Sequence, residues 1–354
     1  MSVDSPLIRA SKKIILNCCL ENGAIVAANS TAETYPKEAK NYLYVWPRDA
    51  SYSCIALDIL GVTGVQEKFF DWLMERAEGW SESGLFYEKY YPNGLQALSR
   101  LQIDQSGVLL YAVSHHYRDS QTIPGKYKKL VIKTADAICN KWSQDHFTVI
   151  TNDLWEERLA FPDLEENFTY SISACYAGLM GIHKFFPDKK YLEKATEMKN
   201  AIINNHETYL FRSFGKLNDP QIDASLLGVI WPFEVIKPTE ALAKNTIREI
   251  ESKLVKDYGV YRYEHDEYDG WMFGAMHRNK GAGFWPLLNF WMAIVLTKMD
   301  RVSEAKRYFE KALPSSSYEI PEQVFDNDIQ KAVSPLCWSH SMFVIAAHEL
   351  GIYE

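Results

Sequence analysis

The chain has 354 residues, of which 47% are hydrophobic and 24% charged, and its formal net charge at pH 7 is −8. This hydrophobic content excludes an intrinsically disordered chain, and the length is sufficient for a large buried core. The acidic balance argues against nucleic acid or an anionic membrane surface as a partner, because both attract basic proteins.

Helical periodicity dominates the chain. Apolar residues recur at helical spacing in about twelve segments, and no Pro-, Gly- or Ser-rich linker separates them. Strand signals are few and short, at residues 24–28 and 147–151, and predict hairpin fragments within loops. The expected helices cover residues 5–20, 48–60, 64–79, 103–117, 125–141, 169–185, 189–205, 223–231, 238–256, 284–299, 301–313 and 336–350.

An even number of helices in series predicts helical hairpins that close into a ring. The alternative, an open helical solenoid, would carry a repeated sequence motif, and none is visible in this chain. The sequence therefore favours an all-α protein with a closed (α/α) barrel as its single domain.

Composition also limits the cofactors and the location of the protein. No apolar run is long enough to span a membrane, and the early run at residues 14–20 lacks the cleavage site of a signal peptide. The six cysteines form no C-x-x-C pair, which predicts reduced thiols and a cytoplasmic location. The nine histidines form no H-E-x-x-H motif, so we expect neither a metal site nor a cofactor.

Polar and aromatic clusters precede or begin every second predicted helix. Alternate helices of a helical ring form its inner wall, so their N-terminal ends share one end of the barrel. Six loops should therefore converge there on one pocket. The clusters lie at residues 45–50, 102–105, 153–157, 223–225, 280–286 and 320–323.

The predicted pocket combines carboxylates, an arginine and several tryptophans, which suits carbohydrate. Carboxylates perform acid–base chemistry at a glycosidic bond, and indole rings stack on sugar rings. Glu156 is the candidate general acid, because its neighbours Trp155 and Glu157 would both raise its pKa. Glu322, which follows Pro321 in a distant segment, is the candidate general base.

These motifs resemble glycoside hydrolase family 15, which contains glucoamylases, glucodextranases and archaeal-type trehalases. The resemblance covers almost the whole chain. It implies an (α/α)6 barrel and an inverting, exo-acting hydrolase that releases β-glucose from α-glucans or oligosaccharides without a cofactor. It rests on ENGAIVAA at residues 21–28, YVWPRDA at 44–50, DLWEER at 153–158, IPEQ at 320–323 and SPLCWSHS at 334–341.

The resemblance also implies individual roles. Glu156 would be the general acid and Glu322 the general base, while Arg48 and Asp49 would bind hydroxyls of the terminal glucose and Glu157 the next sugar. Arginine suits its role because its planar fork binds two oxygens at once. The other expected substrate-binding residues are Trp46, Asp153, Trp155, Trp285 and Trp338.

The chain departs from the family pattern in two respects. Prokaryotic relatives usually carry an N-terminal β-sandwich, and none fits before residue 5. We therefore expect residues 1–354 to form one catalytic domain with neither a β-sandwich nor a starch-binding domain. The family also often has Gly-Asn-Pro-Trp where this chain has Gly-Phe-Trp-Pro at residues 283–286, and the arginine that the family carries upstream could be either Arg262 or Arg278.

Several functions stay open at this point. Within the family, a glucoamylase-like activity is expected first, and trehalase or glucodextranase activity is the alternative. A phosphorylase on a similar barrel would not need the second carboxylate, so Glu322 argues against it. A sugar-binding protein without activity is the alternative from a different class, since a fold alone does not establish activity. The sequence does not indicate an oligomeric state.

Overall fold

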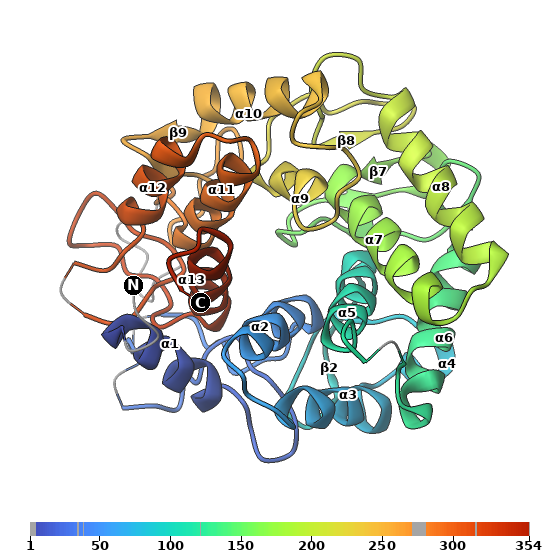
Figure 1. Cartoon of the computed structure of the whole chain (residues 1–354), viewed down its shortest axis with the longest axis horizontal. Helices are drawn as coiled ribbons and strands as arrows, with labels where there is room; N and C mark the ends of the chain where they lie inside the picture. The colour runs from blue at the N-terminus through green and yellow to red at the C-terminus, as the bar shows by residue number, and fades with distance from the viewer. Residues whose placement is uncertain are drawn as a thin grey trace.

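The computed structural model describes residues 5–33, 35–37, 39–120, 122–270, 281–315 and 317–353. Within these ranges the chain forms thirteen α-helices and five antiparallel sheets of two strands each. All of these helices except the short α4 (Trp80–Ser83) are arranged as two concentric rings (Figure 1). None of the described helices combines the length and the apolar character that a membrane span requires.

The inner ring is closed. Each of its helices contacts the next, and the last, α13, packs against the first, α2. These helices are buried on almost all sides, and in α11 every residue from Pro286 to Leu296 is buried. A helix that is apolar all round belongs in a protein interior. The inner helices are α2 (Pro47–Ile59), α5 (Ile103–His116), α7 (Thr169–Phe185), α9 (Leu227–Ile230), α11 (Pro286–Lys298) and α13 (Cys337–Glu349) (Figure 1).

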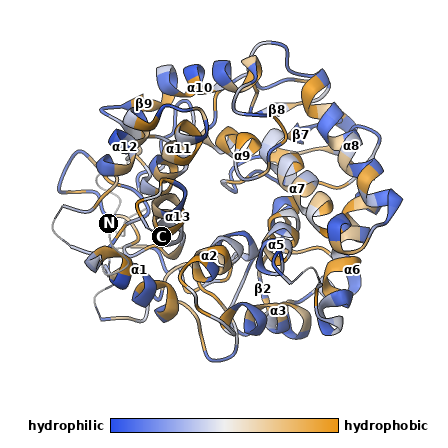
Figure 2. Cartoon of the chain, viewed as in Figure 1, coloured by the Kyte–Doolittle hydropathy of each residue, from blue (hydrophilic) through white to orange (hydrophobic). Residues whose placement is uncertain are grey.

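The outer ring covers the inner one with amphipathic helices. In α12 the buried residues are Ala305, Tyr308 and Phe309, which share one helix face. Hydrophilic residues cover much of the outward sides of these helices (Figure 2). The two rings confirm the predicted (α/α)6 barrel. The outer helices are α1 (Pro6–Asn17), α3 (Val65–Arg76), α6 (Gly125–Lys141), α8 (Lys189–Asn204), α10 (Ala241–Leu254) and α12 (Val302–Lys311) (Figure 1).

Short elements occupy the connections. A one-turn helix, α4 (Trp80–Ser83), follows α3, and two 3-10 turns cover Pro162–Leu164 and Ala224–Leu226. All strand pairs are antiparallel. The strands are β1 (Tyr87–Tyr90), β2 (Gln96–Leu101), β3 (Trp142–Ser143), β4 (His146–Phe147), β5 (Thr151–Asn152), β6 (Leu159–Ala160), β7 (Asn167–Phe168), β8 (Ser213–Phe214), β9 (Val255–Lys256) and β10 (Gly259–Val260).

All twelve predicted helices are present and short hairpins lie in the loops as predicted, but the bounds of the predicted strands are wrong. Residues 24–28 contribute only an isolated bridge between Ile25 and Cys19. Residues 147–151 are divided between two separate pairs, β3–β4 and β5–β6. The longest hairpin, β1–β2, was not predicted at all. Its turn contains Pro92, Asn93 and Gly94, a combination that typically marks a hairpin.

The inner helices α5 and α7 approach each other through glycines. A Cβ atom on Gly107 would lie 2.5 Å from the carbonyl carbon of Ala174, and one on Gly178 would lie 2.5 Å from the carbonyl oxygen of Gly107. Only a residue without a side chain fits such a contact. These two glycines therefore set the spacing of the ring on this side.

Aromatic side chains from the inner ring pack around its centre. Tyr52 of α2 stacks on Trp338 of α13 with ring centroids 5.4 Å apart, and it meets Trp291 of α11 edge-on at 5.8 Å. Tyr170 of α7 also meets Trp291 edge-on, at 6.1 Å. These ring contacts link α2, α7, α11 and α13.

Candidate active site

A cavity of about 700 Å³ opens where the inner helices begin. Trp46, Trp285 and Leu336 line it, and they are the residues that directly precede α2, α11 and α13. This arrangement agrees with the expected convergence of loops at one end of the barrel. Nine of the ten predicted site residues line the cavity, namely Trp46, Arg48, Asp49, Trp155, Glu156, Glu157, Trp285, Glu322 and Trp338.

Arg48 forms the floor of the cavity. Its guanidinium lies 3.0 Å from Oδ1 of Asp49 and 3.2 Å from Oδ2 of Asp104, and it stacks over the ring of Trp338 at 5.1 Å. The backbone N–H of Arg48 donates to Oε1 of Gln105 at 2.5 Å. Burial raises the pKa of both Asp49 and Asp104 to about 6, although the charge of Arg48 opposes this effect. Arg48 and its partners thus hold hydrogen-bond donors and acceptors in fixed positions in the cavity.

Asp153, the tenth predicted residue, lies behind the cavity and organises the turn that carries Glu156. Its Oδ1 accepts hydrogen bonds from the backbone N–H of Glu157 at 2.8 Å and of Arg158 at 3.1 Å. Its carbonyl oxygen accepts one from the N–H of Glu156 at 3.2 Å. Glu156 has a φ of 66°, which is uncommon outside glycine and is retained here by these bonds.

The carboxyl group of Glu156 faces two donors. The indole N–H of Trp46 donates to Oε1, and Nζ of Lys89 lies 3.5 Å from Oε2. Burial and then the nearby charge of Glu88 raise the pKa of Glu156, whereas Lys89 and Arg48 lower it, and together they bring the pKa to about 7. A carboxyl group with this pKa holds a proton in about half of the molecules at neutral pH, far more often than an ordinary glutamate does.

The carboxyl group of Glu322 lies between two tyrosines. The hydroxyl of Tyr42 donates to Oε1 at 2.7 Å, and that of Tyr268 donates to Oε2 at 3.4 Å. Burial raises the pKa of Glu322 to about 7, while the Tyr42 hydroxyl, Arg262 and Lys40 all act to lower it. Glu322 is only 2% exposed, so its orientation is fixed by these partners.

Glu157 belongs to an ion-pair network on the adjacent wall. Arg262 lies 2.9 Å from Oε1 of Glu157 and 2.7 Å from Oδ1 of Asp266, and the hydroxyl of Tyr263 donates to Oε2 of Glu157. The guanidinium of Arg262 also lies 5.0 Å from the ring of Trp285. Of the two arginines considered from the sequence, Arg262 therefore lies in the cavity, and Arg278 falls outside the described residues.

Trp155 is held by a buried carboxylate. Its indole N–H lies 3.0 Å from both carboxylate oxygens of Asp223, which precedes the 3-10 turn before α9. Its ring meets Trp285 at 5.6 Å. The cluster at residues 223–225 thus supports the wall of the cavity from behind.

The tyrosines around Glu322 and the lysines of the cavity were not predicted from the sequence. Tyr42 and Tyr44 precede Trp46 at intervals of two residues, and in an extended segment this spacing places side chains on one side. That alternation could have identified Tyr42. Lys40 and Lys89 also line the cavity, and neither follows a spacing that would have marked it.

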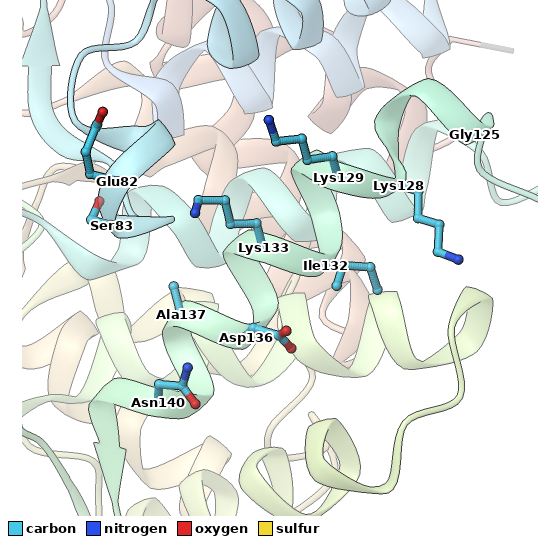
Figure 3. Close-up of a pocket in the computed structure, with 10 residues that line it drawn as sticks. All are labelled: Glu82, Ser83, Gly125, Lys128, Lys129, Ile132, Lys133, Asp136, Ala137 and Asn140. Carbon is cyan, nitrogen blue, oxygen red and sulfur yellow. The ribbon is translucent and has the colours of Figure 1, made fainter.

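A second hollow formed by described residues lacks this combination. This hollow, of about 740 Å³, lies on the outside of the barrel between α4 and α6, where Lys128, Lys129 and Lys133 surround it together with Glu82 and Asp136 (Figure 3). It contains no tryptophan and no facing pair of buried carboxyl groups. Among the described residues, no group of three or more His, Cys, Asp or Glu side chains is arranged to hold a metal ion.

A cavity that holds two glutamates among tryptophans fits glycoside hydrolysis, which uses a pair of carboxyl groups. The chain belongs to the glycosyl hydrolases family 15, whose family model matches residues 14–348. This match covers nearly the whole chain and includes every predicted site residue.

Curated relatives in this family have different names. The chain is 27% identical to an uncharacterised glycosyl hydrolase of Methanocaldococcus jannaschii, over 95% of this chain and 54% of the relative. It is 24% identical to trehalase 2 of Sulfolobus acidocaldarius, over 82% and 53%, and 20% identical to isomaltose glucohydrolase of Kribbella flavida, over 87% and 85%. The chain thus spans about half the length of the first two relatives.

Solved structures show the same fold. A glycosidase in complex with glucose has a TM-score of 0.79 and 20% identity, and the match covers 98% of this chain and 97% of that one. A bacterial glucoamylase in complex with acarbose has a TM-score of 0.76 and 20% identity, over 98% and 55%. At this level of identity, the likeness establishes the barrel and does not establish the substrate.

Proposed function

We propose that this protein is an inverting, exo-acting α-glucosidase in which Glu156 is the general acid and Glu322 the general base. One observation carries this proposal: two glutamates from separate loops enter one cavity, each with its own set of hydrogen-bond donors. Hydrolysis with inversion needs two carboxyl groups, one protonated and one ionised.

Glu156 would deliver its proton to the leaving oxygen. Because the N–H of Trp46 donates to Oε1, the proton of the neutral acid is carried by Oε2. Burial raises the pKa of Glu156 to about 7, so this proton is present in about half of the molecules at neutral pH.

Glu322 would activate the attacking water. Both of its oxygens accept hydrogen bonds from tyrosine hydroxyls, and such bonds favour the ionised carboxylate. Lys40 and Arg262 add positive charge near it. A phosphorylase would not require this second carboxylate, so the partners of Glu322 favour hydrolysis.

The floor and the wall of the cavity would bind successive sugars. Arg48 and Asp49 are buried at the floor, where the terminal glucose would end, which supports removal of one unit at a time. Glu157 and Arg262 lie on the wall and would bind the next unit. The indole faces of Trp155 and Trp285 offer apolar surface for the sugar rings.

The linkage that is cleaved distinguishes the members of the family. A glucoamylase-like activity on α-1,4-linked glucose is the first candidate. Trehalase activity is the second, because curated relatives from Sulfolobus acidocaldarius and Mycobacterium tuberculosis are named trehalases. Isomaltose is a further test substrate, because a Kribbella flavida relative is named isomaltose glucohydrolase.

Proton NMR of fresh digests tests the proposal. Maltose, isomaltose, nigerose and trehalose are incubated with the protein in buffer without phosphate. Initial release of β-glucose from one of them supports inversion and identifies the linkage, and trehalose would give α- and β-glucose in equal amounts. Initial α-glucose alone would contradict an inverting mechanism. Turnover that occurs only after phosphate is added would instead indicate a phosphorylase.

A further inference from the structure

Strand β1 brings two adjacent charged side chains to the candidate acid. Oε1 of Glu88 lies 3.2 Å from Nζ of Lys89, and the same ammonium lies 3.5 Å from Oε2 of Glu156. The other oxygen of Glu88 accepts a hydrogen bond of 2.6 Å from the amide of Asn152. Glu88 is 1% exposed, and the Asn152 amide and the Lys89 ammonium fix the position of its carboxylate beside Glu156.

An irregularity in the strand makes this arrangement possible. Adjacent residues of a regular strand point to opposite faces. The pairing of β1 with β2 shifts register on both sides of Lys89, between Tyr87 and Lys89 and again between Lys89 and Tyr90. Bulges of this kind redirect side chains and occur next to active sites. Here the side chains of Glu88 and Lys89 can meet, although they are neighbours in the chain.

Aromatic rings hold the Lys89 ammonium in place. It lies 5.0 Å from the ring centre of Trp46 and 5.9 Å from that of Tyr44. A cation at this distance is attracted by the ring, and the contact limits its freedom to leave for solvent. Trp46 therefore contacts both the candidate acid and the lysine that faces it.

We propose that Glu88 and Lys89 form a positioning pair that controls proton transfer by Glu156, an inference that rests on the proposed function. Oε2 is the oxygen that carries the proton before transfer and the negative charge after it. Lys89 faces this oxygen, so its attraction grows as the proton leaves and stabilises the transition state more than the ground state. Glu88 opposes this effect, because its negative charge favours the protonated acid.

The pair acts against a background of other charges around Glu156. Arg48 and Asp49 face it from α2, Asp104 from α5, and Lys40 from the loop that precedes α2. These groups are unchanged when only β1 is altered. Removal of either member of the pair should therefore move the pKa of Glu156 in a direction fixed by the charge that is lost.

The test compares pH profiles of kcat/KM on the disaccharide that the protein hydrolyses. Glu88→Gln removes a negative charge and should move the alkaline limb, which reports the acid, to lower pH by about 1 unit. Lys89→Met removes a positive charge and should move the same limb to higher pH by about 1 unit and lower kcat about tenfold. Lys89→Arg keeps the charge and should leave the limb close to the wild-type position.

Matched controls separate this effect from a change in net charge. Glu82→Gln and Lys133→Met make the same charge changes in the outer groove between α4 and α6 (Figure 3) and should leave both limbs in place. Glu156→Gln, assayed on an aryl glucoside whose good leaving group needs no acid, should lose the alkaline limb and thereby identify it.

The outcomes separate the proposed role of Glu88 and Lys89 from the proposed function. Opposite shifts of the alkaline limb in folded Glu88→Gln and Lys89→Met support the pairing. An unmoved limb, or shifts in one direction, overturns it while leaving the proposed function intact. An inactive wild type, or unchanged activity of Glu156→Gln on a disaccharide, overturns the proposed function itself. If Glu88→Gln fails to fold, the comparison of Lys89→Met with Lys89→Arg decides, because only the former removes the charge.

Discussion

The hydroxyl of Tyr42 lies 2.7 Å from Oε1 of Glu322, although 280 positions separate the two residues in the chain. This contact joins the loop before α2 to the loop before α13, which are neighbours because the inner ring closes. Tyr42→Phe removes a donor that favours the ionised carboxylate, so the pKa of Glu322 should rise. The acid limb of kcat/KM should then move to higher pH by about 1 unit.

A neighbouring tyrosine provides the control for this prediction. The ring of Tyr44 packs against Trp46 and Tyr91, and Tyr44→Phe should leave the acid limb at its wild-type position. An unchanged limb in Tyr42→Phe would contradict the assignment of that limb to Glu322.

The unmodified protein should show a narrow pH optimum near neutrality. Activity requires Glu322 ionised and Glu156 protonated, and the pKa of each is raised to about 7 by burial. The value of kcat/KM should therefore rise as Glu322 loses its proton and fall as Glu156 loses its own. With equal pKa values, only about a quarter of the molecules hold the active combination at the maximum. A broad plateau over several pH units would show that the two pKa values lie far apart.

Glu156→Gln should discriminate between leaving groups. A sugar is a poor leaving group and needs the proton, so kcat on a disaccharide should fall by about 100-fold or more. An activated aryl glucoside needs little protonation, and its hydrolysis should be much less affected. Steady-state kinetics on both substrates measure the difference, and equal losses would argue against Glu156 as the acid.

Glu322→Gln should lower kcat by about 100-fold or more on both kinds of substrate, because the attacking water is needed for each. Glutamine keeps the shape of the side chain and can still accept the hydrogen bond from Tyr42. KM and the thermal unfolding temperature should therefore stay close to the wild-type values. Near-normal turnover would remove Glu322 from the role of base.

Gly107→Ala should destabilise the barrel by about 2 kcal/mol, because the new methyl group would overlap the backbone of α7. Gly125 in α6 supplies the matched control, since a Cβ atom there meets no atom within 4 Å. Gly125→Ala should be neutral or stabilising by about 0.5 kcal/mol. Urea unfolding of the two variants measures the contrast, and similar midpoints would contradict the tight crossing of α5 and α7.

The helices were predictable because apolar residues recur at helical spacing in the sequence. Outer helices such as α12 bury one periodic face, and proline at the first turn marks the beginning of α2 and α11. The hairpin β1–β2 was missed because no residue of β2 is buried and the strand shows no alternating apolar pattern. Strands of two residues carry too few side chains for a pattern at all.

The candidate site was predictable in part for a similar reason. Clusters at the beginnings of alternate helices converge in any closed helical ring, and this locates Arg48, Glu156 and Glu322 near one another. The partners of these residues depend on loop conformations. The contact of Lys89 with Glu156 requires a register shift in β1, and the position of Asp153 behind the cavity requires the turn at Glu156. Neither irregularity has a periodic signature.

The packing of α13 against α2 has a consequence for how the protein acquires activity during synthesis. Arg48 is made early on the ribosome, whereas Trp338, on which it stacks, belongs to the last helix of the inner ring. Until that helix emerges and docks, the floor of the cavity is incomplete and Tyr42 lacks Glu322. The nascent chain should therefore gain activity in one late step. The time at which activity appears during translation would then report when the ring closes.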